Sequence, residues 1–108
     1  MKIINIIKKI KKRYSEDITF NEAKTILNKN DNVILLDVRS SQEFNEGHLV
    51  NAINIPLFEL EDRVESRIKD KSTIIIAYCS AGIRSKKAVK ILRRMKYVNV
   101  FNIGEEYR

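Results

Sequence analysis

The feature that most limits the possible folds is an uncharged, mostly apolar run, Thr73–Tyr78, which ends at the single cysteine, Cys79. A short run with no alternation of polar residues predicts a strand buried on both faces, as in a parallel sheet covered by helices. A second continuous apolar run, Val33–Leu36, ends at Asp37. The sequence therefore predicts a central sheet with at least two fully buried strands.

Helical segments are predicted between the strands. Thr19 and Glu22 have the spacing of a capping box, which starts a helix that ends in the turn Asn28–Asn32. Ser40 and Glu43 have the same spacing and predict a second, short helix. The other expected elements are strands at Ala52–Ile55 and Val98–Ile103, a helix or two within Leu57–Ile68, and a helix from Ser85 onward. Strands that alternate with helices predict an α/β domain with a mainly parallel sheet.

The positive charge of the chain is concentrated near its N-terminus. At 108 residues the chain has room for one domain, which we place at 15–108, after a segment 1–14 that holds six of the 21 lysines and arginines. Ile3, Ile7, Ile10 and Tyr14 recur at helical spacing, with lysines on the opposite face. We expect this amphipathic helix to dock on the domain, in preference to binding nucleic acid or a membrane surface.

The cysteine and histidine counts exclude several classes of protein. One cysteine forms no internal disulfide, and Cys79 with His48 cannot make a Cys/His metal site, so we expect neither a metal nor a cofactor. Lysines interrupt residues 1–14 too often for a signal peptide, and no apolar stretch reaches the length of a membrane span. We therefore expect a cytoplasmic protein.

A reactive cysteine is predicted at the edge of the sheet where the strands end, because open α/β sheets bind ligands there. Cys79 follows a buried strand, and Gly82 lets the loop curl so that backbone N–H groups point inward as an anion nest. The next helix contributes its positive N-terminal end, and Arg84 contributes a fixed charge. Both favour the thiolate, which is the nucleophilic form. We expect Ser85 to cap this helix.

Several short motifs, taken in order and spacing, resemble the rhodanese family between about Ile18 and Gly104. The motifs are Leu36–Arg39, Glu43–Phe44, Glu46–Leu49, Asn54–Pro56, the loop Cys79–Arg84 and the pair Asn99–Val100. The resemblance implies a five-stranded parallel sheet flanked by helices. It also implies that Cys79 accepts sulfane sulfur, from thiosulfate or a persulfide, and passes it to a thiol. Asn51 stands where the family tends to have glycine, so we expect a positive φ there.

The candidate site has catalytic, substrate-binding and supporting residues. Cys79 and Arg84 are the catalytic residues; the substrate-binding residues are Ser80, Ala81, Gly82, Ile83 and Ser85, and the supporting residues are Asp37, Arg39, Glu43 and His48. We expect the first three supporting residues to form a charged cluster, and His48, which resembles the family's turn histidine, to form hydrogen bonds. Tyr78 is expected in the core. A simpler alternative is that Cys79 is a buried structural thiol, but its place between a strand and Arg84 favours a reactive one.

Three other functions remain to be weighed against a sulfurtransferase. Protein-tyrosine-type phosphatases have a loop one residue longer than the four residues, Ser80–Ile83, that separate Cys79 from Arg84 here. A second alternative is a non-enzymatic module that docks a partner and only relays the persulfide. The presence of both Cys79 and Arg84 favours an enzyme. An RNA-associated sulfur donor is indicated by the basic segment 1–14 alone. The expected partners are a small sulfur donor, a thiol acceptor and, as a further option, a sulfur-relay protein.

Overall fold

The computed structural model describes Asn5, Ile7, Lys8 and residues 16–107, and shows a parallel sheet of five strands. The strands are β1 (Asp17–Ile18), β2 (Val33–Asp37), β3 (Ile53–Asn54), β4 (Ile74–Tyr78) and β5 (Val100–Ile103). Their order across the sheet is β1-β5-β4-β2-β3, and all four neighbouring pairs are parallel. The predicted α/β class and the five-stranded parallel sheet are confirmed.

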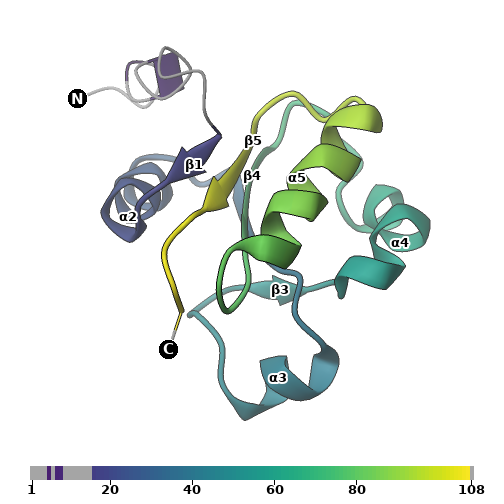
Figure 1. Cartoon of the computed structure of the whole chain (residues 1–108). Coiled ribbons are helices and arrows are strands. Elements are labelled where there is room, and N and C mark those ends of the chain that lie inside the picture. Colours follow the sequence, from purple (N-terminus) through teal and green to yellow (C-terminus); the bar gives the residue numbers. More distant parts are fainter. Residues whose placement is uncertain (1–4, 6, 9–15, 108) are drawn as a thin grey trace.

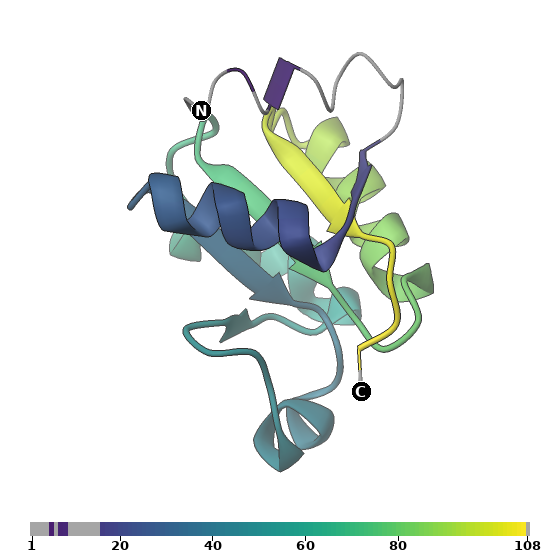
Figure 2. The same cartoon turned by 90° about the vertical axis from the view of Figure 1, so that its left-hand side faces the viewer.

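Helices cover both faces of this sheet. They are α2 (Phe20–Lys29), α3 (Ser41–Glu46), the 3-10 helix η1 (Leu57–Glu59), α4 (Leu60–Arg67) and α5 (Ile83–Arg94). Figure 1 shows α2 on one side of the sheet and α4 and α5 on the other, and Figure 2 shows α2 lying across the strands. Helix α3 lies beyond the ends of the strands (Figure 1). No helix among the described residues is long and apolar enough to span a bilayer.

Strand β4 connects two hydrophobic cores, because successive side chains of a strand point to opposite faces. Ile75 and Ala77 pack in the core that α4 and α5 cover, whereas Ile76 and Tyr78 pack in the core that α2 covers. Every residue of β4 is buried. Shortening Ile76, whose exposure is 0%, to alanine is therefore expected to cost about 2–5 kcal/mol.

Local sequence signals fix the helix starts. Thr19 and Glu22 make both hydrogen bonds of the predicted capping box of α2, and Ser40 and Glu43 do the same for α3. Asn51 has a φ of 66°, as expected for a turn in which asparagine replaces glycine. These predictions are confirmed.

The N-terminal part of the chain differs from expectation in one place. Strand β1 occupies Asp17–Ile18, where the sequence analysis predicts no element. Two residues are too few to show an alternating pattern, so the strand exists because it pairs with Asn102 and Ile103 of β5. Of the predicted helix at 1–14, the structure describes Asn5, Ile7 and Lys8 as helical, and Ile7 is buried against the core beneath α2. The rest of that prediction, and the boundary at residue 14, lie outside the described residues.

The register of the sheet brings two distant segments to one edge. Asp37, the last residue of β2, lies beside Tyr78, the last residue of β4. The Val38 N–H donates to the Tyr78 carbonyl at 3.1 Å, so the two chains leave the sheet side by side. Cys79 and Arg39 therefore begin their loops at the same edge, as predicted for a ligand site.

Candidate active site

The loop after β4 closes quickly into helix α5. Gly82 has a φ of 84°, in the left-handed region that favours glycine, and α5 begins at the next residue. A side chain at Gly82 would also approach the Gly104 carbonyl, because a Cβ there would lie 3.5 Å from that oxygen. The expectation that Ser85 caps the helix is wrong. The chain turns helical two residues earlier, which places Ser85 in the first turn with its hydroxyl toward Cys79.

Hydrogen-bond donors surround the sulfur of Cys79. The N–H groups of Gly82 and Ser85 lie 3.1 and 3.4 Å from Sγ, and the Ser85 hydroxyl lies 3.3 Å from it. Cys79 is 1% exposed. Burial raises the pKa of the thiol, but hydrogen bonds from Ser85, Ala81 and Gly82 outweigh it and leave the pKa below its ordinary value. The inward N–H groups agree with the predicted anion nest, and they stabilise a thiolate.

Arg84 lies at the mouth of the loop and is already paired. Its Nη1 donates to Oε1 of Glu43 at 2.6 Å and its Nη2 donates to Oε2 at 3.0 Å. The Ser80 hydroxyl donates to the same carboxylate at 3.3 Å. The hydrogen bond from Arg84 lowers the pKa of Glu43 to about 2, and that bond raises the pKa of Arg84. Most of the Arg84 charge is therefore neutralised by Glu43, a pairing that the sequence analysis did not predict.

A second guanidinium pair lies deeper. Arg39 Nη2 donates to Oδ2 of Asp37 at 2.7 Å and to the Gly47 carbonyl at 2.6 Å. Both side chains are almost fully buried, with exposures of 8% and 0%. The hydrogen bonds that Arg39 donates to Asp37 raise the pKa of Arg39. The three predicted charged residues therefore belong to two separate ion pairs, Asp37 with Arg39 and Glu43 with Arg84, and only the second lies beside the Cys79 loop.

The remaining predicted residues have local contacts. His48 Nδ1 lies 2.8 Å from the Phe44 carbonyl oxygen, and its ring stacks on that of Phe44 at 3.7 Å. These contacts fit the expected hydrogen-bonding role. Tyr78 is 0% exposed, and its hydroxyl accepts a hydrogen bond from the Leu49 N–H at 3.0 Å, so it belongs to the core as expected. Burial raises the pKa of Tyr78.

Two supporting residues were missed by the sequence analysis. Asn54 donates from Nδ2 to the carbonyls of Asp37 and Arg39 at 2.9 and 3.0 Å, and so fixes the end of β2. Tyr107 donates its N–H to the Ser80 carbonyl at 2.8 Å, and its ring centroid lies 4.8 Å from the Arg39 guanidinium carbon. The Asn54 motif was visible in the sequence. Nothing in the sequence predicts the Tyr107 contact, because the C-terminal segment reaches the loop only after folding.

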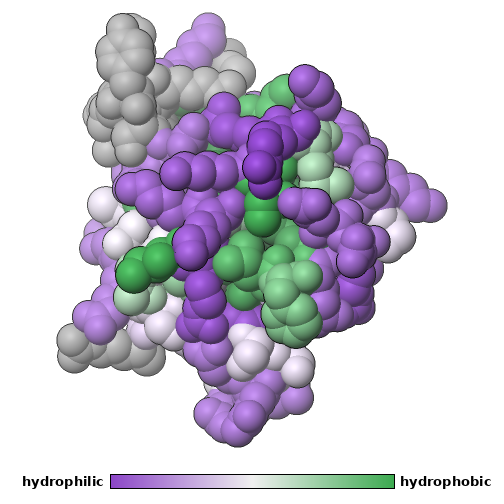
Figure 3. All heavy atoms as spheres, turned by 45° about the vertical axis from the view of Figure 1, so that its right-hand side comes forward, coloured by the Kyte–Doolittle hydropathy of each residue, from purple (hydrophilic) through white to green (hydrophobic). Residues whose placement is uncertain are grey.

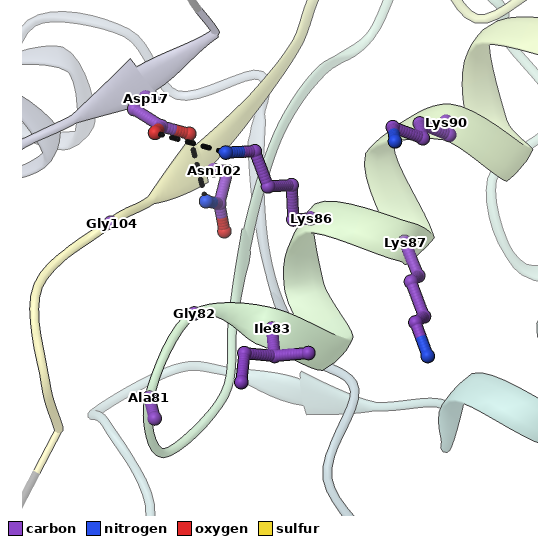
Figure 4. Close-up of a pocket in the computed structure, with 9 residues that line it drawn as sticks. All are labelled: Asp17, Ala81, Gly82, Ile83, Lys86, Lys87, Lys90, Asn102 and Gly104. Carbon is purple, nitrogen blue, oxygen red and sulfur yellow. Dashed lines mark hydrogen bonds and ion pairs between the residues drawn. The ribbon is translucent and has the colours of Figure 1, made fainter.

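A cavity of 320 Å³ lies behind the loop, between β5 and α5 (Figure 4). Ala81 and Gly82 line one end, and the Lys86 and Lys90 side chains point toward β5. Asn102 donates to Asp17 at 2.9 Å and is buried there. Among the residues that the structure describes, no group of three or more His, Cys, Asp or Glu side chains could hold a metal ion.

Fold and loop together define a class of α/β proteins in which a single cysteine is held between a central parallel strand and the following helix. A family model described as the rhodanese-like domain matches residues 19–107. That range includes every described element after β1. The chain belongs to the rhodanese-like family.

Known relatives agree with this assignment. The thiosulfate sulfurtransferase PspE of Escherichia coli is 39% identical over 69 residues, which cover 64% of this chain and 66% of PspE. A solved rhodanese with anions from E. coli is 36% identical, with a TM-score of 0.65 and coverage of 68% and 87%. A solved human single-domain sulfurtransferase, 24% identical, has a TM-score of 0.76 over 87% and 93% of the chains, and shows the fold alone. The chain spans between 17% and 66% of the length of the first curated relatives that it matches.

Proposed function

We propose that this chain is a single-domain sulfurtransferase that carries sulfane sulfur as a persulfide on Cys79. The observation that carries the proposal is the arrangement of donors around the sulfur: two backbone N–H groups and the Ser85 hydroxyl lie within 3.4 Å of Sγ. Donors arranged in this way stabilise negative charge on sulfur in both the thiolate and the persulfide. Family membership and the name of PspE support the same reaction class.

The first step loads the cysteine. The Cys79 thiolate attacks the outer sulfur of thiosulfate, the sulfur–sulfur bond of thiosulfate breaks, and sulfite leaves with the bonding electron pair. The product is a Cys79 persulfide whose terminal sulfur carries the negative charge. The inward N–H groups of Ala81, Gly82 and Ser85 are the groups we assign to hold that charge. Because Cys79 is 1% exposed, a slender donor end has to enter the loop.

In the second step the persulfide sulfur leaves Cys79. An acceptor thiolate attacks the terminal sulfur, the bond between that sulfur and Cys79 Sγ breaks, and Cys79 returns to the thiolate. The acceptor leaves as a persulfide, so atoms and electrons balance with no external oxidant. The sequence offers no second cysteine to resolve the persulfide internally. We therefore expect the loaded form to persist until an external thiol reaches it.

Arg84 and Ser80 are assigned to the mouth of the site. The pair that Arg84 forms with Glu43 makes this mouth nearly neutral, which suits persulfide donors and neutral thiols as well as thiosulfate. Asp37, Arg39 and His48 are assigned supporting roles away from the reacting sulfur. We also propose a reducing, cytoplasmic compartment, because a lone thiol that must remain reduced functions best there.

The test is intact mass after incubation with thiosulfate. We expect a gain of one sulfur atom per chain that added dithiothreitol reverses and that Cys79→Ser abolishes. The loaded protein, freed of excess donor, should keep its adduct until thiol is added. A protein that gains no sulfur from thiosulfate or from a small persulfide, or one that hydrolyses an aryl phosphate instead, would contradict the proposal.

A further inference from the structure

An apolar groove runs along helix α5 from the mouth of the cysteine loop. It encloses 530 Å³ between η1, α4 and α5, and its lining residues are Leu57, Phe58, Glu61, Asp62, Arg84 and Ile91. Arg84, in the first turn of α5, lines the groove and lies beside the loop that holds Cys79. Figure 3 shows an apolar hollow on this side of the molecule, surrounded by hydrophilic side chains. A ligand in the groove therefore lies directly beside the proposed site of sulfur transfer.

Two large apolar side chains near this groove are turned to solvent. Phe58 is 83% exposed and Ile83, in the first turn of α5, is 67% exposed. The neighbouring Leu57 and Ile91 pack partly against the core, so their contribution to folding explains why these positions are apolar. Packing in the core does not explain why Phe58 and Ile83 are apolar. Phe58 lines the groove, whereas Ile83 lines the cavity between β5 and α5. An exposed apolar side chain beside an apolar groove with a polar rim, as at Phe58, is typical of a protein contact site.

Helix α5, which forms one side of the groove, is strongly basic. This helix contains six lysines and arginines and no acidic residue. Four of them pair with carboxylates of other elements: Arg84 with Glu43, Lys86 with Asp17, Arg93 with Glu16 and Arg94 with Glu61. Within the described part of the chain, Lys87 and Lys90 have no ion pair. Both are exposed, and with Ile91 they line a second hollow, of 570 Å³, that adjoins the groove.

We propose that this groove docks an acidic segment of a partner protein whose cysteine exchanges sulfur with Cys79. An apolar side chain of the partner lies between Phe58 and Ile91, and its carboxylates face Lys87 and Lys90. On the opposite rim Glu61 pairs with Arg94, and Asp62 repels acidic groups, so Asp62 disfavours the opposite placement of those carboxylates. The inference rests on the proposed function, and it identifies the kind of acceptor or donor that the site takes.

An acidic peptide fits these observations better than a nucleic acid does. A polyanionic backbone would have to pass Glu61 and Asp62, and it has no aliphatic group to fill the space beside Leu57 and Ile91. The hot spots of protein interfaces are typically a buried apolar or aromatic anchor with charged residues around it. Charge complementarity at Lys87 and Lys90 would then speed the encounter.

The probe is a short synthetic peptide that carries one cysteine, one leucine and several glutamates. Control peptides replace the leucine with serine or the glutamates with lysines. The protein is loaded with sulfur from thiosulfate, and transfer to each peptide is followed by mass. Test variants are Phe58→Ser and the double variant Lys87→Glu with Lys90→Glu. Matched controls are Val98→Ser, another exposed apolar residue, and Lys24→Glu with Lys29→Glu on α2, beyond the opposite face of the sheet.

We expect transfer to the acidic peptide to fall about tenfold in each test variant and to stay unchanged in the controls. The double charge reversal should instead prefer the lysine peptide, a gain that loss of folding could not produce. Transfer to dithiothreitol should stay the same in all variants. Equal rates for all peptides, or tight binding of single-stranded RNA at Lys87 and Lys90 in place of the peptide, would overturn the docking proposal.

A second measurement separates this proposal from the function on which it rests. Binding of the same peptide, with serine in place of cysteine, is measured by fluorescence anisotropy with unloaded protein. Binding that depends on Phe58, Lys87 and Lys90 supports the docking surface even if Cys79 accepts no sulfur. Normal loading without such binding overturns the docking surface and leaves the sulfurtransferase proposal intact.

Discussion

The two guanidinium–carboxylate pairs at the carboxyl edge of the sheet differ in almost every respect except their chemistry. Asp37 and Arg39 are two residues apart, and their side chains are 0% and 8% exposed. Glu43 and Arg84 are 41 residues apart, and their side chains are 34% and 38% exposed. The first pair joins β2 to the turn at Gly47. The second joins α3 to the first turn of α5, beside the Cys79 loop.

Burial decides what each pair can do. A buried pair that loses one partner leaves an uncompensated charge in a medium of low dielectric, so the fold depends on its remaining intact. A half-exposed pair is screened by water and contributes little to stability. Its effect is on the local charge, because Glu43 cancels a guanidinium that would otherwise attract anions to the mouth of the Cys79 loop. The deep pair is therefore structural, and we assign the outer pair to the control of charge at the site.

Breaking the buried pair should give the largest effect. Asp37→Ala leaves the Arg39 guanidinium buried without its partner, and we expect the free energy of unfolding to fall by about 3–5 kcal/mol. Urea denaturation of the variant and the parent protein measures this difference in the free energy of unfolding. The double variant Asp37→Asn with Arg39→Gln, which removes both charges, should recover part of the loss. A loss below 1 kcal/mol in the single variant would mean that the pair is not structural.

Breaking the outer pair from the arginine side should affect chemistry more than stability. In Arg84→Gln, Glu43 places an uncompensated negative charge at the mouth, so loading from the thiosulfate dianion should slow about tenfold. The free energy of unfolding should fall by less than about 1 kcal/mol. Loading rates by mass and urea denaturation of the same variant test both statements. Loading as fast as in the parent protein would remove Arg84 from the proposed machinery.

Removing the carboxylate of the same pair should change the rate of loading from thiosulfate in the opposite direction. Glu43→Gln keeps a side chain that can complete the capping box of α3 but frees the Arg84 charge. Loading from thiosulfate should then rise about threefold at low salt, and the gain should shrink as ionic strength rises. Alkylation of Cys79 should also shift to lower pH. A slower reaction in Glu43→Gln would show that the carboxylate takes part in chemistry rather than in charge balance.

The pH dependence of stability gives the smallest expected effect. Hydrogen bonding to Arg84 lowers the pKa of Glu43 from 4.5 to about 2. A carboxylate with a lowered pKa in the folded state contributes stability that is present above pH 4.5 and is lost as the pH falls toward 2. The parent protein should therefore exceed Glu43→Gln in stability by less than about 1 kcal/mol near neutrality, after allowance for solvent screening. This difference in stability between the two proteins should vanish as the pH falls from 4.5 toward 2. Urea denaturation of both proteins at a series of pH values measures it.

Local sequence patterns predicted much of the fold. Both capping boxes and the positive φ at Asn51 depend on interactions between near neighbours in the chain. Strands β2 and β4 pair with distant strands, but each is a continuous apolar run that shows its burial in the sequence. Patterns failed where an element has no such signal of its own. Strand β1 forms because it pairs with β5, and the hydroxyl of Ser85 turned to the sulfur instead of capping a helix.

The candidate site shows the same division between features set by local sequence and features set by long-range contacts. The sequence by itself determined the loop that surrounds Cys79, the proposed nucleophile. Cys79, Gly82 and the start of α5 follow one another closely, and their geometry follows from a strand that turns into a helix. Only the tertiary structure decided that Glu43 neutralises Arg84 and that Tyr107 lies over Arg39. Those contacts join residues far apart in the chain, and the charge at the mouth depends on the sheet register that brings them together. No local spacing specifies that register, because it results from packing every strand and helix at once.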